Sequence, residues 1–448
     1  MYIKKIRLNN FRNYEKEEFE FKNRFNVIYG DNAQGKTNII EAIYLSSIGK
    51  SFRAKKDSEL IKIGEDKAVI ELEYVRSDRE GIIKIEIDNK KNFYLNGIKQ
   101  KKLSDIIGKV HVVLFNPDDI NIIKEGPANR RKFLDIMISQ LKPNYLHILN
   151  TYLKTIEQRN IYLRQIKYEN KDKELLEIWD IKLAELSEKI YNYRNYYIQK
   201  IKEKIKDIHN NITNCGNLCE NIEISYLSSG KNKNEFYANL VKSRNTDIKR
   251  GFTSAGIHRD DFSVYINDKE VSTYGSQGQQ RTSILSLKLT ELNIIYDEIG
   301  EMPILLLDDF MSELDEHRRE NFIKTIKDNQ VFITCTDKII LDKTENQIYK
   351  IEKGKKIWYK IKDDLMYINI CKDIIIKLDD IVGIFEIGQN SRKDTNEFLE
   401  RMSENKKIID VSEGNTKSLI LYTKGGEECG ILSNISTSSL GKKKKIIN

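Results

Sequence analysis

A glycine-rich stretch near the N-terminus has the residue types and the spacing that bind phosphate groups. It consists of Gly30, Asp31, Asn32, Ala33, Gln34, Gly35, Lys36 and Thr37. The stretch fits the Walker A pattern, and it follows an apolar run that predicts a strand over 25–29. In such a loop backbone N–H groups surround the phosphates, and the helix that follows adds a favourable dipole. We expect Lys36 to contact the β- and γ-phosphates and the Thr37 hydroxyl to bind Mg²⁺. The cofactors predicted are therefore ATP and Mg²⁺.

Two neighbouring carboxylates supply the second chemical signal. Asp308 and Asp309 come at the end of an apolar run that starts at Pro303, and acids at the carboxyl end of a buried strand lie where α/β sheets bind ligands. This is the composition of a Walker B motif, in which Asp308 would hold Mg²⁺ directly or through water. Asp309 stands where ABC ATPases usually have a glutamate that orients the attacking water. We therefore predict that Asp309 is the catalytic residue. Because its side chain is one methylene shorter than glutamate, we expect slow hydrolysis, suited to a switch more than to a motor.

A third motif indicates that the nucleotide site is shared between two molecules. It reads Ser276, Gln277, Gly278, Gln279, Gln280 and Arg281, and it begins a long predicted helix ahead of the two carboxylates. Such a string alone is often a helix cap, but its order and position here are those of the ABC signature motif. In that arrangement the signature helix contacts the γ-phosphate held by a second protomer, so Ser276, Gly278 and Gln279 are candidates for nucleotide binding. A stretch with D-loop composition follows at Ser312, Glu313, Leu314 and Asp315. We therefore predict an ATP-dependent homodimer.

The elements that must position these motifs alternate between strands and helices. Periodicity predicts strands over 2–9, 19–29, 68–75, 82–88, 110–115, 262–266 and 304–308, and helices over 277–296 and 316–328. Asn96-Gly97 predicts a hairpin turn. Long charged segments with apolar residues three and four apart extend from 128 to about 209 and predict a helical insertion. The fold class predicted is α/β, with an ATPase lobe over 1–115 and 250–361, a helical insertion lobe over 116–249 and a small β-rich domain over 366–448.

Composition is that of a globular protein with intermingled charges. Of the 448 residues 39% are hydrophobic, and 76 Lys and Arg face 68 Asp and Glu. Such a balance permits nucleic-acid binding without requiring it. No apolar run approaches the roughly 18 residues that a bilayer span needs, so we expect a cytoplasmic protein without a membrane partner. His209, Cys215 and Cys219 lack a fourth ligand at plausible spacing, and we do not predict a zinc site.

Further segments give the first 361 residues a specific resemblance. The sequence resembles the RecF family of bacterial recombination ATPases, related to the heads of SMC proteins, through Asn10-Phe11-Arg12-Asn13-Tyr14, Gly49-Lys50-Ser51-Phe52-Arg53, Phe115-Asn116-Pro117-Asp118-Asp119, Asn129-Arg130-Arg131-Lys132-Phe133-Leu134-Asp135 and Gly256-Ile257-His258-Arg259-Asp260-Asp261. The resemblance implies an ABC/SMC-type P-loop ATPase head that dimerises with ATP on double-stranded and single-stranded DNA. It also implies RecO and RecR partners, a role in gap repair and replication restart, and support of the SOS response.

Two residues that ABC ATPases use are missing from their usual places. The Q-loop glutamine is not evident, Asn116 being the nearest candidate, and Thr334, Cys335 and Thr336 stand where the switch histidine is expected. The sequence alone does not identify the group that senses the γ-phosphate from that side.

Candidates for DNA contact are clusters of cations. Arg130, Arg131 and Lys132 begin one predicted helix, and four lysines alternate along another segment: Lys200, Lys202, Lys204 and Lys206. Cations of this kind bind phosphates by releasing counterions, although most charge clusters are solvated helix faces. Arg12 and Arg53 would approach either the nucleotide or DNA.

Two other functions are consistent with the nucleotide motifs. The chain would then be the ATPase subunit of an ABC transporter, or a scaffold for recombination proteins in which hydrolysis is incidental. The SMC-like string Asn10-Phe11-Arg12 ahead of the Walker A motif argues against transport. An arm of about 60 residues, ~90 Å at 1.5 Å per residue, is too short for a true SMC coiled coil.

Residues 366–448 resemble the small RemA/RemB-type regulatory family. The resemblance rests on Asp379-Asp380-Ile381-Val382-Gly383-Ile384, Thr395-Asn396-Glu397-Phe398-Leu399 and Lys417-Ser418-Leu419-Ile420-Leu421. Some members of that family are DNA-binding regulators, which would fit the basic tail at Lys442–Lys445. A small β-rich oligomerisation module is the alternative.

Overall fold

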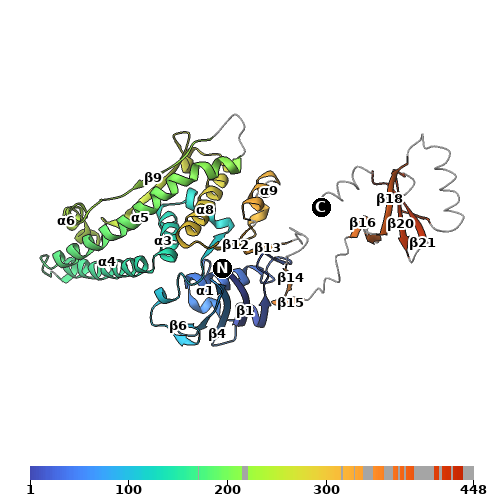
Figure 1. Cartoon of the computed structure of the whole chain (residues 1–448). Coiled ribbons are helices and arrows are strands. Elements are labelled where there is room, and N and C mark those ends of the chain that lie inside the picture. The colour runs from blue at the N-terminus through green and yellow to red at the C-terminus, as the bar shows by residue number, and fades with distance from the viewer. Residues whose placement is uncertain are drawn as a thin grey trace. The chain divides into compact units, whose positions relative to one another are not determined.

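The computed structural model divides into two compact units, Met1–Trp358 and Tyr359–Asn448, each described by itself (Figure 1). The structure describes residues 1–169, 171–213, 220–313, 316–326, 328–336, 347–357, 367–371, 374–377, 380–387, 408–412, 416–424 and 427–436.

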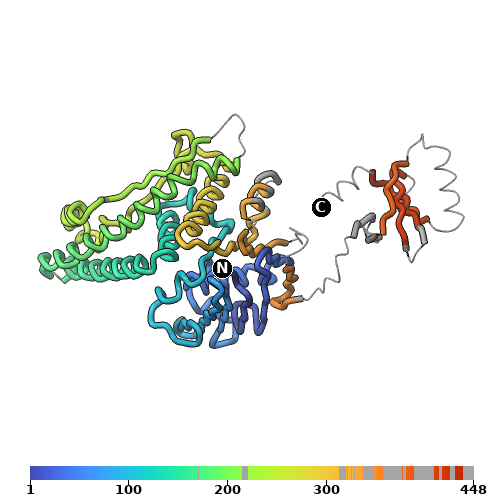
Figure 2. Tube along the Cα trace, in the orientation of Figure 1, coloured from blue at the N-terminus to red at the C-terminus, as the bar shows by residue number. Residues whose placement is uncertain are grey.

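A mostly parallel sheet forms the centre of the first unit. Its strands, in spatial order, are β15 (Lys355–Ile357), β14 (Gln347–Glu352), β3 (Phe25–Tyr29), β13 (Val331–Cys335), β12 (Ile304–Asp308) and β8 (Val112–Phe115). Three of these strands, β8, β12 and β13, are buried at every residue, as strands covered on both faces require. Parallel pairing places Tyr29 beside Cys335 and Thr334 beside Asp308, so the Walker A and Walker B segments leave the sheet at the same edge. Figure 2 shows the same neighbourhood, in which the blue N-terminal trace runs beside the orange trace of residues far along the chain.

A second, antiparallel sheet covers the helix that follows the Walker A loop. Its strands are β2 (Tyr14–Glu20), β1 (Tyr2–Phe11), β4 (Ala68–Arg76), β5 (Arg79–Ile87), β6 (Lys91–Leu95) and β7 (Ile98–Lys99). Helix α1 (Lys36–Ile48) lies in one hydrophobic core with residues of both sheets, including Ile6 of β1 and Leu306 of β12. Because apolar surface surrounds it, α1 is buried on nearly all sides. The helix is therefore fixed between the two sheets, while residues 31–33 of the loop before it are exposed.

The helical lobe is built from long helices and a small sheet. Its helices are α2 (Asn121–Lys124), α3 (Pro127–Leu141), α4 (Pro143–Glu169), α5 (Leu176–Thr213), α6 (Lys233–Arg250) and α7 (Val271–Tyr274), and the strands β9 (Ile222–Leu227), β10 (Asp261–Ile266) and β11 (Lys269–Glu270) pair in the order β11-β10-β9. The fully buried Arg159 of α4 donates to Asp180 of α5 at 2.7 Å and to Asp247 of α6 at 2.8 Å. Since all three charges are buried, this network fixes the three helices against one another.

Helix α8 (Gln277–Ile299) joins the two lobes. One set of its apolar residues, including Ile284 and Leu287, lies in the core of the helical lobe. Another set, including Leu285 and Leu289, packs with β12 and β13 and with α9 (Glu316–Thr325). The signature helix thus lies between the helical lobe and the ATPase sheet, with one face against each.

The structure confirms most predicted elements and corrects several of their limits. The predicted strand over 19–29 is two strands, because the chain leaves β2 at Glu20 and enters β3 at Phe25. The strand over 262–266 is confirmed. It pairs with β9 and lies in the core of the helical lobe, and not in the ATPase lobe as predicted. The turn at Asn96-Gly97 is confirmed, with φ of 49° and 80° between β6 and β7. Helix α9 ends at Thr325, three residues before the predicted limit.

The second unit is β-rich, as predicted. Strands β16 (Tyr367–Cys371) and β17 (Ile374–Lys377) form a hairpin, and β18 (Ile381–Glu386), β20 (Ser418–Lys424), β21 (Glu427–Ser433) and β19 (Ile408–Asp410) form a sheet in that order. Ile376, Ile420 and Ile431 form its buried core.

A buried histidine should make the stability of the protein depend on pH. Burial lowers the pKa of His111 to about 4, from 6.5 in the unfolded chain. Below pH 6.5 the unfolded chain therefore binds a proton that the folded chain does not, and the free energy of unfolding falls as the pH drops toward 4. At about 1.4 kcal/mol per pH unit, this one residue should cost about 2 kcal/mol between pH 7 and pH 5.

Urea unfolding at the two pH values measures this effect. His111→Asn should reduce the pH 7 to pH 5 difference by about that amount, whereas His147→Asn, at an exposed position, should leave the difference as it is. An unchanged difference in the His111 variant would contradict the assignment.

Candidate nucleotide-binding site

Gly30 and Gly35, at the two ends of the Walker A loop, lie too close to neighbouring atoms to carry a side chain. Gly30 has φ of 150°, and a Cβ there would lie 2.4 Å from the carbonyl oxygen of Ile351. Gly35 has φ of 114°, and a Cβ there would lie 2.6 Å from Nδ2 of Asn13. Any larger side chain would displace β14 or Asn13, so both positions require glycine.

The ammonium group of Lys36 is held across the loop. Its Nζ donates to the carbonyl oxygens of Gly30 at 2.6 Å and of Asp31 at 3.0 Å, and the residue is buried. The positive charge therefore lies among the backbone groups that would surround a phosphate.

The Walker A and Walker B segments meet at a pair of oxygen atoms. The Thr37 hydroxyl donates to Asp308 Oδ1 at 2.8 Å, and the Thr334 hydroxyl donates to the same oxygen at 2.8 Å. Burial raises the pKa of Asp308, although the two hydroxyls and the charge of Arg53 oppose that rise. A hydroxyl and a carboxylate are the oxygen ligands that Mg²⁺ prefers. Over the described part of the chain no three His, Cys, Asp or Glu side chains form a metal cage.

Asp309 lies at the edge of the same site with an unusual backbone. Its φ is 49°, a left-handed conformation that aspartate and asparagine adopt more readily than glutamate. Its N–H donates to the Thr334 hydroxyl at 2.9 Å. Thr334 therefore links both acids, a role that the sequence did not predict beyond marking residues 334–336 as a departure from the ABC pattern.

An open pocket of about 650 Å³ lies over the loop. Its lining includes residues 32–38 and Asp309, together with Arg12, Asn13, Arg53, Glu59, Ile61, Lys62 and Ile63. Arg12 and Arg53 were predicted to approach either the nucleotide or DNA, and both face this pocket. Asn13, whose side chain donates to Gln34 O at 2.8 Å, was missed as a residue of this wall.

A buried acid organises the wall that carries the two arginines. Glu41 of α1 is fully buried and accepts from Arg12 Nε at 2.8 Å and from Nη2 at 2.7 Å. It also accepts from the Ser51 hydroxyl, and Ser51 Oγ in turn accepts from the N–H groups of Arg53 and Ala54. An acid inside an otherwise apolar helical stretch was the available signal for this role, because a buried carboxylate needs partners.

The signature residues stand apart from this pocket. Ser276 caps α8, and none of Ser276, Gly278 and Gln279 is among the described residues that line the pocket. The chain therefore carries the phosphate loop and the signature motif at separate places. Of the predicted D-loop, Leu314 and Asp315 lie outside the described residues.

The predicted DNA-contacting cations differ in how far they are already engaged. Arg130 binds Asp261 through two bonds, at 2.6 and 2.8 Å, and also donates to Glu125 O at 2.7 Å. Arg131 donates to Asp260 O at 2.7 Å, and Lys132 is exposed. A DNA contact by these three residues stays a prediction, for which Lys132 needs the least rearrangement.

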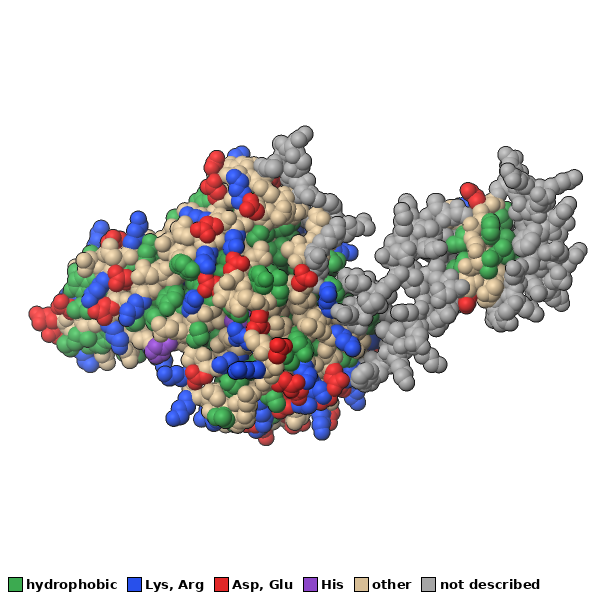
Figure 3. Space-filling view, viewed as in Figure 1, with side chains coloured by type: hydrophobic (Ala, Val, Ile, Leu, Met, Phe, Trp, Pro, Cys, Tyr) green, Lys and Arg blue, Asp and Glu red, His purple; other side chains and the backbone are tan. Residues whose placement is uncertain are grey.

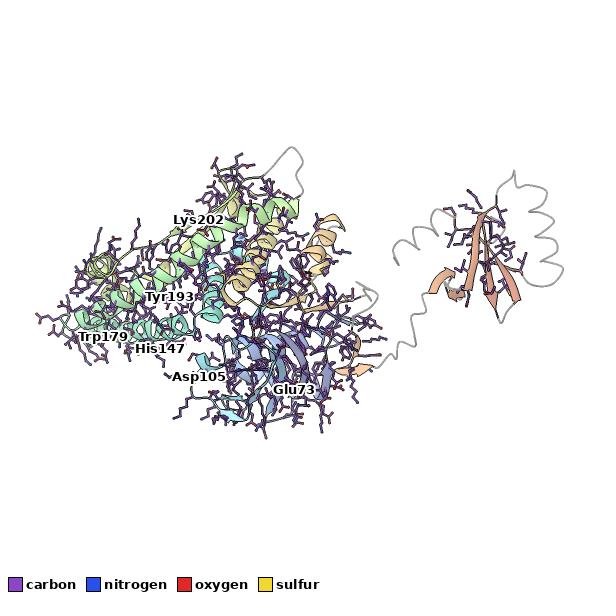
Figure 4. The ribbon with its side chains drawn as sticks, viewed as in Figure 1. Glu73, Asp105, His147, Trp179, Tyr193 and Lys202 are labelled. Atoms are coloured by element: carbon purple, nitrogen blue, oxygen red, sulfur yellow. The ribbon has the colours of Figure 1, made fainter. Side chains whose placement is uncertain are left out.

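The four lysines of α5 divide into two pairs. Lys200 binds Glu298 at 2.5 Å and Lys204 binds Asp297 at 2.6 Å. The other pair, Lys202 and Lys206, is exposed, and Figure 4 labels Lys202 well along α5 from Trp179. In Figure 3 basic and acidic side chains are interspersed over the visible face of the first unit, so no single-sign patch marks a DNA surface in this view.

The cysteines weighed for zinc, Cys215 and Cys219, lie outside the described residues. His209 lies 2.9 Å from Ser286 Oγ and 3.1 Å from Glu220 Oε2.

A Walker A loop, a Walker B strand and a separate signature helix, set on two sheets with an inserted helical lobe, define a P-loop ATPase head. Residues 2–358 match the RecF/RecN/SMC N-terminal domain family. The chain belongs to the RecF family of DNA replication and repair proteins: it is 44% identical to RecF of Acetivibrio thermocellus over 368 residues, covering 79% of this chain and 99% of the relative. RecF of Clostridium kluyveri is likewise 44% identical over 366 residues, covering 79% of this chain and 99% of that relative.

A solved structure gives the same result for the fold. A structure of the recombination mediator protein RecF with ATP in the RecFOR pathway is 42% identical, has a TM-score of 0.74, and covers 80% of this chain and 98% of that one. Residues 367–443 match the family of proteins similar to extracellular matrix regulatory protein A, which confirms the RemA-type resemblance. The family match does not favour the alternative of a transporter subunit. Among the described helices none is long and apolar enough to span a bilayer.

Proposed function

We propose that the first unit binds Mg²⁺-ATP in the pocket over residues 30–37. The observation that carries the proposal is the 2.8 Å bond between Thr37 and Asp308, which are 271 residues apart in sequence. It brings a hydroxyl and a carboxylate together beside the ammonium group of Lys36, as a magnesium-bound triphosphate requires. The related solved structure is described as RecF with ATP, which supports the same ligand here.

We further propose that a second copy of the chain completes the site. The pocket is open, and the Ser276 motif lies elsewhere on the same chain. In a head-to-tail pair each signature helix would direct its N-terminus at the γ-phosphate held by the partner. Hydrolysis with Asp309 in the place of a glutamate would be slow and would release the pair.

The proposed biological partner is DNA, both double-stranded and single-stranded, at gaps and stalled forks. Membership of the RecF family supports this proposal, as does the description of the related structure as a recombination mediator of the RecFOR pathway. RecO-type and RecR-type proteins are the proposed protein partners.

Sedimentation and ATPase assays of the full chain, with and without ATP and with double-stranded DNA at low salt, test these proposals together. ATP should shift the chain to a dimer, and DNA should stimulate its ATPase. Dimerisation and ATPase activity that are both unaffected by DNA would contradict the proposal that DNA is the working partner.

The exposed lysines of α5 give a specific prediction. If DNA lies along this helix, Lys202→Glu with Lys206→Glu should weaken binding to double-stranded DNA about tenfold at low salt, because two phosphate contacts become repulsions. ATP-dependent dimerisation should not change. Fluorescence anisotropy over a salt series measures the effect, with Lys182→Glu and Lys189→Glu near the outer end of α5 as the matched control. Equal affinity of the two double variants would place the DNA elsewhere.

A further inference from the structure

The N-terminus of the signature helix α8 is held by side-chain hydrogen bonds that the motif itself does not predict. They run from Ser276 through Gln279 to Glu220, which precedes β9, and on to His209 of α5. We propose that Glu220 is a positioning residue for the signature motif, which fixes the Gln279 amide and so presents the Ser276 hydroxyl to a phosphate. This inference rests on the proposed function, in which Ser276 contacts the nucleotide of a second copy.

The side-chain amide of Gln279 has two possible orientations, and Glu220 selects one. Nε2 of Gln279 lies 2.8 Å from Glu220 Oε1, and Oε1 of Gln279 lies 3.0 Å from the backbone nitrogen of Ser276. A carboxylate only accepts hydrogen bonds, so the amide nitrogen must face Glu220. The reversed amide would set oxygen against oxygen at Glu220 and donor against donor at Ser276. Because it can only accept, the Glu220 carboxylate keeps the amide oxygen of Gln279 on the Ser276 N–H.

The orientation of Gln279 determines what the Ser276 side chain can do. Ser276 Oγ accepts from the backbone N–H of Gln279 at 3.2 Å, which completes a reciprocal cap with the bond from Ser276 N to Gln279 Oε1. Ser276 is exposed, and its hydroxyl hydrogen finds no acceptor within the described ranges. The oxygen is thus occupied from inside while the O–H remains to donate outward, which is the polarity that an anionic phosphate requires.

Glu220 is itself fixed by a buried group. Its Oε2 lies 3.1 Å from His209 Nε2, and the other ring nitrogen of His209 lies 2.9 Å from Ser286 Oγ, on α8. His209 is fully buried, whereas a quarter of the Glu220 side chain is exposed. The two carboxylate oxygens therefore have different partners. One bonds Gln279 of the signature motif, and the other bonds His209, which contacts Ser286 on the same helix, seven residues after Gln279. A carboxylate with both oxygens bonded has one position from which to orient Gln279.

Loss of the carboxylate should weaken dimerisation without weakening nucleotide binding by the single chain. In the full-length chain Glu220→Ala should reduce ATP-dependent dimerisation about tenfold, since it removes a hydrogen bond to a charged group that orients the motif. Affinity of the monomer for a fluorescent ATP analogue should be unchanged, because the pocket is elsewhere. Glu220→Gln keeps one oxygen that can accept from Gln279, but it removes the charge and can also present its nitrogen, so it should restore only part of the loss. Glu223→Ala, which removes an exposed carboxylate of β9, is the matched control and should behave as the wild type.

Mixing variants separates positioning from a general folding defect. In a mixed dimer of Glu220→Ala with Lys36→Met, one of the two sites combines an intact phosphate loop with an intact signature motif. ATPase activity of the mixture should exceed the sum of the two variants measured alone, whereas Glu220→Ala mixed with Ser276→Ala should show no recovery. Wild-type dimerisation by Glu220→Ala, or no recovery with Lys36→Met, would overturn the inference. A wild-type chain that stays monomeric with ATP would instead overturn the proposed function.

Discussion

Replacing Lys36 by methionine should lower the affinity for ATP by about a hundredfold or more and abolish ATP-dependent dimerisation. The ammonium group lies within 3.0 Å of two carbonyl oxygens of the loop, where it would neutralise charge on the β- and γ-phosphates through charge-assisted hydrogen bonds. Methionine retains the length and apolar contacts of the stem, so the buried side chain should still pack. The loss of the two hydrogen bonds to the loop should lower the unfolding temperature slightly, whereas the main loss should appear in binding.

Titration with a fluorescent ATP analogue and sedimentation of the same samples measure these two effects. Lys16→Met changes an exposed lysine of β2 and is the matched control. The experiment also decides the scaffold alternative. A Lys36→Met chain that fails to bind ATP but still complements repair and retains its partners would show that nucleotide binding is incidental.

The sequence was sufficient to predict that the two motifs of the proposed nucleotide site lie together, because each motif is local in the chain. Residues 25–37 and 304–309 each contain a strand and the functional groups that follow it in one short stretch, and parallel pairing through β13 brings the two stretches to one edge. The start of helix α8 could be predicted for the same reason, since capping by Ser276 depends only on the residue three positions further on.

What the sequence could not provide are the groups that hold these motifs from a distance. Glu41 joins Arg12 and Ser51 across two loops, and Glu220 reaches Gln279 across 59 residues. Such contacts depend on how lobes pack, and no periodicity records that. The strand over 262–266 was assigned to the wrong lobe for the same reason, because an apolar strand does not specify which sheet it joins. The sequence also does not show which cations are already paired: Arg130, predicted to contact phosphate, is bound to Asp261.

Substituting Asp309 by asparagine should slow ATP hydrolysis about a hundredfold and leave ATP-dependent dimerisation intact. A carboxylate at this position would orient and polarise the attacking water, and an amide of the same shape cannot accept its proton. Asparagine tolerates the left-handed φ of 49° as well as aspartate does, so the backbone and the bond from N–H to Thr334 should persist. The variant should accumulate as a nucleotide-bound dimer, because the step that separates the copies is blocked while the groups that bind ATP remain.

Asp309→Glu provides the opposite arm of this experiment. The longer side chain reaches the position that ABC ATPases use, and hydrolysis should rise several-fold if reach limits the rate. It should rise less if the left-handed backbone, which suits glutamate poorly, displaces the carboxylate. Single-turnover hydrolysis by preformed dimers measures all three chains at equal occupancy. A rate that does not change in Asp309→Asn would remove this residue from the chemical step, and an Asp309→Asn chain that stays monomeric at saturating ATP would contradict the shared site on which the proposed switch depends.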